Sequence, residues 1–305
     1  MRYSLIATSG LLATVYSHGL VTSIKGANGV VMPGLSVADG TPRDCTSNSC
    51  GSQADTAIIR DREISSGKAS ALGRTQGNGP IDPAVMIQNF MGAGATVPTN
   101  NGSGTGVEDD IPANVAKKST SFPRALKDLL SGLTGGAGGN KAKTGAGTKT
   151  ETAEETSVAS TAGQGATSGL PTCADDGSIT MTFRQINQDG AGPIEAAVDG
   201  TSGGQDPDAF KTAEVTQDVP GSGFLGLSTA TNTDFPLTVQ MPAGMTCDAT
   251  VGDAQNVCIV RVRNNAIAGP FGGSAAFTQS PAARKRAINY RLKKRSNAEQ
   301  NRRLR

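Results

Sequence analysis

The amino-acid sequence predicts a mainly β protein: an antiparallel β-sandwich with a long disordered insertion and a disordered basic C-terminal tail. Several short runs of alternating apolar residues are separated by Gly, Pro and Asn turns, which is typical of such a sandwich. The 305 residues include 40 Gly and no Trp, and only 4% are aromatic. This composition favours short strands and many turns over a helical bundle.

Residues 1–17, MRYSLIATSGLLATVYS, predict a secretory signal peptide. Arg2 precedes a mostly apolar run, and Val15 and Ser17 occupy the positions that signal peptidase reads. The run is shorter than the roughly 20 apolar residues that a transmembrane helix needs, and no later stretch is more apolar. We therefore expect a secreted protein, extracellular or at the cell surface, without a transmembrane segment.

Cleavage after Ser17 would make His18, the single histidine of the chain, the mature N-terminus. An N-terminal histidine can chelate copper through its amine and its ring, because neutral imidazole is a good copper ligand. A copper brace needs a second imidazole, which this sequence does not contain. His18 is therefore the one candidate metal ligand, and an incidental product of the cleavage site is the alternative interpretation.

The first part of the sandwich is expected over residues 18–98. LVTSIKG predicts a strand in which Leu20 and Ile24 face one side, and ANGVVMPGLSV adds an Asn-Gly turn and a second apolar run. DPAVMIQNFMG predicts a short helix that Asp82 caps and Pro83 begins.

Residues 99–164 are expected to form a flexible insertion. They are rich in Gly, Ala, Thr and Ser and poor in large apolar side chains. Asn101 begins the sequon Asn-Gly-Ser and is the expected glycosylation site. The carboxylates of Glu108, Asp109 and Asp110 are a candidate site for a cation or a partner.

The second part of the sandwich is expected over residues 165–283. In DGSITMTFRQ the residues Ile179, Met181 and Phe183 alternate, which indicates a strand with one buried face. Further strands are predicted in GPIEAAVDG, FPLTVQMPAG, NVCIVRVRNNAIAG and GPFGGSAAFTQ.

Secretion makes disulfide bonds the expected use of the five cysteines. Cys247 and Cys258 flank a turn between two strand-like runs, and we expect them to pair. Cys45 and Cys50 could close a small loop, but Cys173 could equally pair with either of them, so one cysteine stays free or pairs between chains. The sequence has no CxxC motif and no His/Cys cluster, so a structural zinc site is not expected.

The tail, residues 284–305, carries ten Lys and Arg and one acid, whereas residues 18–283 hold 17 Lys and Arg against 25 Asp and Glu, a net charge of −8. We expect the tail to be disordered, removable by Golgi proteases at the dibasic sites that end at Arg286 and Arg295, and able to adhere to anionic surfaces such as a cell wall; the alternative is a merely solvated terminus. With one aromatic residue in the tail and no nucleic-acid-binding motif, no nucleic-acid partner is expected.

Several long blocks carry a family pattern: HGLVTSIKGANGVVMPGLSVADGTPRDC, SQADTAIIRDREI, ALGRTQGNGPID, GLPTCADDGSITMTFRQINQDGAGPI, TDFPLTVQMPAGMTC and VCIVRVRNNAIAGPFGG. In these blocks, over roughly residues 18–98 and 165–279, the chain resembles the Egh-type (Egh16-like) family of secreted fungal appressorial virulence factors, which includes MAS-type cell-surface proteins. The resemblance implies a secreted or surface protein of host penetration, with no established reaction.

In outline, this family is similar to the lytic polysaccharide monooxygenases, which bind copper through two histidines and the N-terminal amine on an immunoglobulin-like sandwich. Only His18 matches a ligand in this chain, and Phe271 in GPFGG is the candidate for the axial aromatic position. Arg184 lies in the strand where the second histidine would be expected, and its protonated guanidinium would repel copper. This departure counts against oxidative cleavage.

Two hypotheses follow from the sequence. The first is a non-catalytic virulence-associated protein that uses no cofactor and binds a cell-wall polysaccharide or a host surface component. The second is a copper protein that uses His18. Other chemistry has little support, because neither Asp175 and Asp176 nor Asp206 and Asp208 have a spacing that identifies a glycosidase pair, and no GxSxG motif is present.

Overall fold

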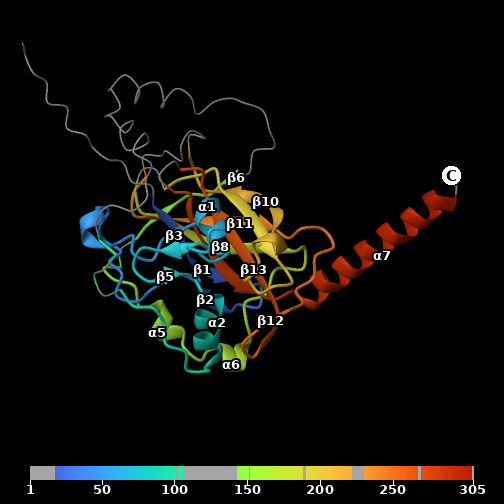
Figure 1. The fold of residues 1–305 in the computed structure, drawn as a ribbon, viewed down its shortest axis with the longest axis horizontal. Helices are drawn as coiled ribbons and strands as arrows, with labels where there is room; N and C mark the ends of the chain where they lie inside the picture. The colour runs from blue at the N-terminus through green and yellow to red at the C-terminus, as the bar shows by residue number, and fades with distance from the viewer. Residues whose placement is uncertain are drawn as a thin grey trace, which may run out of the picture.

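The fold was obtained as a computed structural model, which describes residues 18–100, 102, 104–105, 143–150, 152–187, 190–221, 230–266 and 269–303 (Figure 1). Four predictions lie wholly or partly outside these residues: the signal peptide 1–17, the sequon residue Asn101, the carboxylates of residues 108–110 and residues 106–142 of the flexible insertion.

The described strands form one 14-stranded, mainly antiparallel sheet in the order β2-β1-β8-β11-β10-β9-β13-β14-β3-β4-β5, with β12, β6 and β7 attached beside this path. The predicted, mainly antiparallel β architecture is confirmed, and the strands follow one another in a single sheet that curls into a half-barrel. The strands are β1 Gly19–Lys25, β2 Val31–Pro33, β3 Ala57–Ile58, β4 Arg74–Thr75, β5 Gly79–Pro80, β6 Lys143–Thr144, β7 Thr148–Lys149, β8 Ser178–Gln185, β9 Glu195–Asp199, β10 Lys211–Asp218, β11 Thr233–Gln240, β12 Ala249–Val251, β13 Ala254–Arg263 and β14 Phe271–Phe277.

The strand β10 joins the two halves of the curled sheet. Its first residues, 211–213, pair with β9, and residues 214–217 pair with β11. The register shifts between Val215 and Gln217, and such irregularities let a strand turn from one sheet direction into another. The curl brings β1 across the face of β14.

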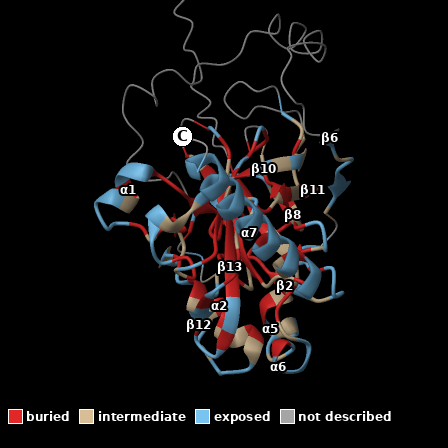
Figure 2. Ribbon diagram, turned by 90° about the vertical axis from the view of Figure 1, so that its right-hand side faces the viewer, coloured by how far each residue is buried: buried red, intermediate tan, exposed pale blue. Residues whose placement is uncertain are grey.

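Buried residues concentrate on the strands at the centre of the molecule (Figure 2). In a strand exposed on one face, alternate residues are buried because successive side chains point to opposite faces of the sheet. In β8 the buried positions include Ile179, Met181 and Phe183, as the sequence predicted. All seven residues of β14 are buried, since β13 and β3 flank it and β1 packs across it. Gly273 permits this close approach, because a Cβ there would lie only 2.7 Å from the backbone nitrogen of Val21.

The predicted helix after Asp82 is present as α2, Pro83–Met91, and the Asp82 carboxylate accepts a hydrogen bond from the backbone of Ala84 at 2.9 Å. It packs beside α5 and α6 in a small helical layer. The remaining short helices are α1 Asp61–Ser65, α5 Ser157–Thr161, α6 Gly165–Ser168, and the 3-10 turns η1 Asn48–Cys50 and η2 Pro207–Ala209.

The ordered body extends into the predicted insertion. β6 and β7 pair with β10 and β11, and α5 begins where the Asp39 carboxylate accepts hydrogen bonds from the backbones of Val158 and Ala159 at 3.0 and 2.7 Å. Residues 143–150 and 152–164 therefore belong to the fold.

The described part of the basic tail is a helix, α7 Pro281–Arg303, and not the disordered segment that the sequence predicted. The Ser280 hydroxyl caps it by accepting the Ala283 backbone N–H at 3.1 Å, and Ala283 and Ala287 are buried against the body. The segment contains no Gly and is rich in Ala, Lys and Arg, which favour a helix. None of the described helices is long and apolar enough to cross a membrane.

Candidate functional site

His18 lies directly before β1 and is fully buried. Its carbonyl accepts a hydrogen bond from the backbone of Ile186 at 2.9 Å, which places it beside the end of β8. Gly190 packs against the same carbonyl, where an added Cβ would lie 2.0 Å from the oxygen. The backbone therefore holds the histidine at a fixed position and leaves no room for a larger residue at 190.

Both nitrogens that an N-terminal histidine could offer to a metal face one side chain. The His18 backbone nitrogen donates to Asn187 Oδ1 at 2.6 Å, and the Asn187 amide nitrogen lies 3.3 Å from His18 Nδ1. The imidazole packs on Phe271, with ring centroids 4.6 Å apart and an angle of 37° between the planes. Asn187 thus forms a bridge across the two nitrogens.

A copper brace does not fit the residues present. Among the described residues, no three His, Cys, Asp or Glu side chains lie close enough together to hold a metal ion. Beside the amine and ring of His18, Asn187 offers an amide, which is a harder and weaker ligand for copper than imidazole. Phe271 packs on the His18 ring, and the sequence offers no second histidine.

Arg184 takes part in a buried network of its own. It pairs across the sheet with Leu20, and its guanidinium donates to the carbonyl of Arg43 and lies 3.4 Å from Asp234 Oδ1. Arg43 in turn forms ion pairs with Asp55 at 2.6 Å and Glu155 at 2.8 Å. Arg184 therefore serves the packing of β8 against the loop around residue 43.

Buried carboxylates elsewhere are also paired with arginines. Glu63 bonds to Arg60 at 2.8 Å and to Arg74 at 2.7 Å. Burial alone would raise the pKa of Glu63, but the hydrogen bonds from Arg74 and Arg60 outweigh it and lower that pKa. Burial likewise opposes ionisation of Glu155, yet the charge of Arg43 leads the effects that lower its pKa. These groups are held ionised and serve the fold.

The second candidate site is an open groove of about 550 Å³ between α7, the loop that follows β9 and the loop that follows β11. Its polar and charged lining comes from Thr201, Asp206, Asp208, Lys211, Thr246, Asp248, Tyr290, Arg291 and Lys294. Three carboxylates and three cations therefore line it together with one phenol. Such a mixed lining offers both donors and acceptors to a polar ligand.

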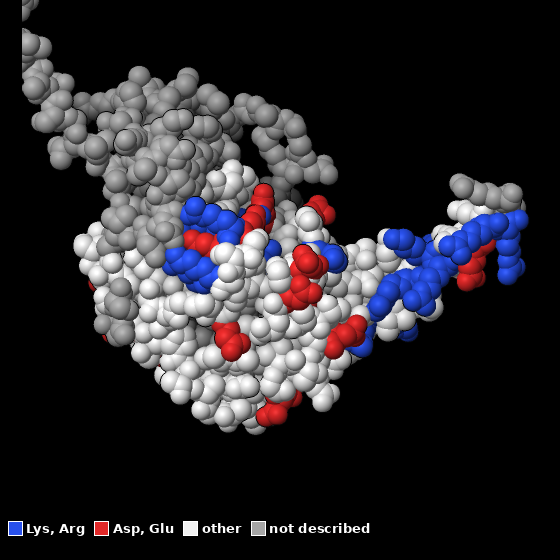
Figure 3. Space-filling model, viewed as in Figure 1, with Lys and Arg blue, Asp and Glu red and all other residues white. Residues whose placement is uncertain are grey.

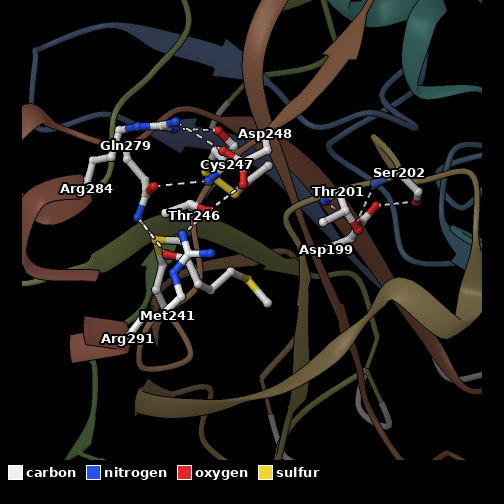
Figure 4. Close-up of a disulfide and its surroundings, with 12 residues drawn as sticks. Asp199, Thr201, Ser202, Met241, Thr246, Cys247, Asp248, Gln279, Arg284 and Arg291 are labelled. Carbon is white, nitrogen blue, oxygen red and sulfur yellow. Dashed lines mark hydrogen bonds and ion pairs between the residues drawn. A yellow bond between two sulfur atoms is a disulfide. The ribbon is translucent and has the colours of Figure 1, made fainter. Parts of the chain in front are cut away.

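Hydrogen bonds fix one wall of the groove, and Figure 4 shows them. The Gln279 side chain accepts from the backbone of Cys247 at 3.0 Å and donates to the carbonyl of Met245 at 3.0 Å. From α7, Arg284 donates to the carbonyl of Cys247 at 2.8 Å and to Asp248 Oδ1 at 3.1 Å. Arg291 donates to Thr246 Oγ1 at 2.6 Å.

The loop that forms the opposite wall is held by Asp199 (Figure 4). Its carboxylate accepts hydrogen bonds from the backbones of Thr201, Ser202 and Gly204 at 2.7 to 2.9 Å. Burial would raise the pKa of Asp199, but the hydrogen bonds led by Ser202 lower it. Hydrogen bonds within the protein therefore hold both walls of the groove in place.

The structure contains two disulfide bonds, Cys247–Cys258 and Cys45–Cys50. The first joins the groove loop to β13, and it is the pair that the sequence favoured. The second closes the small loop between Cys45 and Cys50. The sequence had left open that Cys173 pairs with one of these two cysteines instead. Cys173 is a buried thiol, and burial raises its pKa.

The acidic clusters noted in the sequence have local structural roles. Asp175 accepts a hydrogen bond from Ser280 at 2.7 Å, and Asp176 accepts from the backbone of Ser178 at 2.8 Å. Asp206 caps η2 through the backbone of Asp208 at 2.9 Å. Of these acids, only the last two line the groove.

Sequence reasoning missed the residues that complete both sites. Asn187 lies in the family block that contains RQINQDGAGP but was given no role, Asp248 carries no motif, and Tyr290 and Arg291 lie in a tail that was expected to be disordered. The heptad-like spacing of Arg284 and Arg291 was the signal that could have indicated a helix face.

Comparisons with known proteins agree on one family. A family model described as Egh16-like virulence factor matches residues 16–272. The appressoria-specific virulence factor GAS2 of Pyricularia oryzae is 54% identical over 298 residues, which are 97% of this chain and 95% of that protein. The appressoria-specific virulence factor GAS1 of the same fungus is 39% identical over 132 residues, 42% of this chain and 51% of that protein. No solved structure matches significantly.

Proposed function

Because the chain belongs to the Egh16-like virulence factor family, we propose that it is a secreted protein of appressorium-mediated host penetration that binds a cell-wall polysaccharide or a host surface component and catalyses no reaction. The names of the relatives support a virulence role in appressoria. Two disulfide bonds and the predicted signal peptide support an extracellular location.

The observation that carries the binding proposal is the groove beneath α7. It is open, and its walls combine carboxylates and cations with the half-exposed Tyr290. Sugars and polar polymers are recognised by such hydrogen-bonding side chains beside an aromatic ring. The supporting bonds of Gln279 and Asp199 hold the walls in place before any ligand arrives.

The state of the carboxylates supports binding without catalysis. An acid catalyst needs a carboxyl group whose pKa is raised and which faces the ligand. The buried Glu63 and the partly buried Glu155 are ionised partners of arginines, and Asp248 in the groove is bonded to Arg284. Burial does raise the pKa of Asp218, but this carboxylate holds the turn at Ile194 and does not line the groove.

Retention on insoluble wall material tests the groove directly. We expect Tyr290→Ala to lower retention of the mature chain severalfold, because it removes the aromatic side chain of the lining. Leu292→Ala is the matched control, since Leu292 is similarly exposed on the same helix but does not line the groove. Equal retention of both variants and the parent chain would refute the role of the groove.

A second candidate function is copper binding by the mature N-terminus, as in proteins related to lytic polysaccharide monooxygenases. The observation that favours it is that the backbone nitrogen and Nδ1 of His18 face the same point, so both could reach one ion if Asn187 moved aside. Titration of the mature chain with Cu(II) tests this function, and one-to-one binding in the nanomolar range that His18→Ala abolishes would support it.

A further inference from the structure

The helix α7 has an anchored half and a projecting half (Figure 1). Ala283 and Ala287 are buried, and Arg284 and Arg291 donate hydrogen bonds to the body. Every described side chain from residue 292 to residue 303 is exposed. Lys and Arg follow the projecting half along its length (Figure 3).

One face of α7 carries arginines along the whole helix. With 3.6 residues per turn, Arg284, Arg291, Arg295 and Arg302 lie within about 40° of one another around the axis. We call these four residues the arginine stripe. It is roughly 27 Å long at 1.5 Å per residue. The two anchored members bond to oxygens of the groove wall, whereas Arg295 and Arg302 continue the same line beyond the body.

The projecting half is poorly stabilised by itself. Arg291 and Arg295 are four residues apart and Arg291 and Lys294 three apart, and like charges at these spacings destabilise a helix. Glu299 is the single acid of this half. A helix this short without tertiary packing is marginal in water, so an anionic partner along the stripe would stabilise it.

The composition of the projecting half indicates what kind of partner fits. Beyond Leu292, residues 293–303, KKRSNAEQNRR, contain no apolar side chain larger than Ala, and the exposed large apolar side chains of α7, Ile288, Tyr290 and Leu292, all lie in its first twelve residues. A protein interface needs an apolar core and a membrane-surface helix needs an apolar face, so neither partner is favoured. Guanidinium groups pair with carboxylates through two parallel hydrogen bonds. The best match is a linear polymer of carboxylates.

The projecting half of α7 also keeps an anionic polymer away from the acidic body. The net charge of residues 18–283 is −8, which would repel a polyanion at close range. Arg302 lies about 16 Å along the helix from Arg291, whereas charges are screened over about 8 Å at physiological salt. A projecting helix can therefore hold a polyanion that the body itself would not attract.

We propose that the arginine stripe of α7 is a docking surface for an acidic polysaccharide, whose carboxylates bind Arg295 and Arg302. This inference rests on the proposed binding function and names the chemical class of one wall component. The polymer lies along the projecting part of the stripe, and Arg291, which also lines the groove, marks the end of the stripe next to the body.

The test measures binding of the mature chain to polygalacturonate, with a neutral glucan as the reference polymer. Mass spectrometry first verifies that the chain retains Arg303. The double variant Arg295→Glu/Arg302→Glu removes the stripe, and Lys293→Glu/Arg303→Glu makes the same change of net charge on other faces of α7. We expect the stripe variant to bind polygalacturonate about tenfold more weakly or worse, the control to lose less than about threefold, and binding of the parent to weaken as salt rises.

Three results would overturn the proposal: equal losses in the two variants, equal binding to the neutral glucan, and stronger binding to anionic lipid vesicles than to polygalacturonate. A dimer that forms through α7 in the absence of polymer would instead assign the stripe to a second copy of the chain. If the stripe variant is retained on wall material as strongly as the parent chain, this inference alone is refuted. Absence of any retention by the parent chain refutes the proposed function.

Discussion

At the residue scale, the contacts of His18 with Asn187 decide what the mature N-terminus can do. The side-chain amide of Asn187 lies 2.6 Å from the backbone nitrogen and 3.3 Å from Nδ1, so the histidine has a protein partner on the side where a metal would sit. The sequence identified His18 from the cleavage site and Phe271 from a family pattern. It could not identify Asn187, because the contact joins residues 169 positions apart through the pairing of β1 with β8.

Titration of Cu(II) into the mature chain, with its N-terminus verified, tests the metal hypothesis. Two nitrogens of one residue and no second imidazole predict weak binding, with a Kd of about 1 μM or higher. His18→Ala should abolish this binding. One-to-one binding in the nanomolar range that is lost in His18→Ala would contradict the first function and favour the copper alternative.

Replacement of Asn187 tests its structural role. Asn187→Ala leaves the buried nitrogen of His18 without the Asn187 acceptor, which should lower the free energy of unfolding by about 1–3 kcal/mol. Urea denaturation measures the change, and Gln255→Ala on an exposed strand position is the control. A variant as stable as the parent would show that Asn187 does not hold the N-terminus.

At the element scale, the sequence predicted strongly patterned elements better than it predicted elements that depend on the rest of the fold. β8 and β11 have alternating large apolar residues and were found, and α2 has a clear cap at Asp82. β10 was missed because most of its residues are at least partly exposed, so its sequence KTAEVTQD carries little pattern. α7 was expected to be disordered because it is rich in Lys and Arg, and the residues that it buries, Ala283 and Ala287, are too small to give a clear apolar pattern.

The structure distinguishes the two dibasic sites of α7. Arg286 donates a hydrogen bond to the carbonyl of Asp175 at 2.7 Å and lies between the buried Ala283 and Ala287, whereas Arg295 lies in the projecting half. A protease needs local unfolding of its substrate, and this is easier where tertiary contacts are few. When the folded chain is treated, without polymer, with a protease that cuts after dibasic sites, we expect cleavage after Arg295 to precede cleavage after Arg286, and the intact mass of the products measures the order. Cleavage after Arg286 as the main product would contradict this view of α7.

At the scale of the whole molecule, the sequence predicted the β class and its antiparallel pairing, but not the continuous curled sheet. Whether strands form two sheets or one depends on β10, which pairs with both neighbours through a register shift near Val215. No short sequence pattern predicts such a register shift. The groove could not be predicted from the sequence either, because its lining comes from three segments far apart in the chain: the loop after β9, the loop after β11 and α7.

Ion pairs and hydrogen bonds to carboxylates make the stability of the whole molecule depend on pH. The pKa values of Glu63, Glu155 and Asp199 are lower in the folded chain than their usual values. Their stabilising contribution is therefore present above the pKa of about 4 that carboxyl groups have in the unfolded chain, and it is lost as pH falls through the folded values.

We accordingly expect the Tm to fall steeply between about pH 5 and pH 2. Glu63→Gln should lower the Tm at pH 7 and reduce its fall with acid, because the ion pairs with Arg60 and Arg74 are lost. Glu214→Gln, at an exposed position of β10, is the control and should leave the profile unchanged. Scanning calorimetry across this range measures both, and a flat profile of the parent chain would contradict the role of these pairs.

The central claim is binding without turnover, and one measurement tests it most directly. Mature protein is incubated with insoluble wall material, and both the retained protein and the soluble sugars are quantified over time. We expect saturable retention of intact protein and no release of oligosaccharide above the level of a protein-free control. Release of sugars in molar excess over the protein, growing with time, would contradict it.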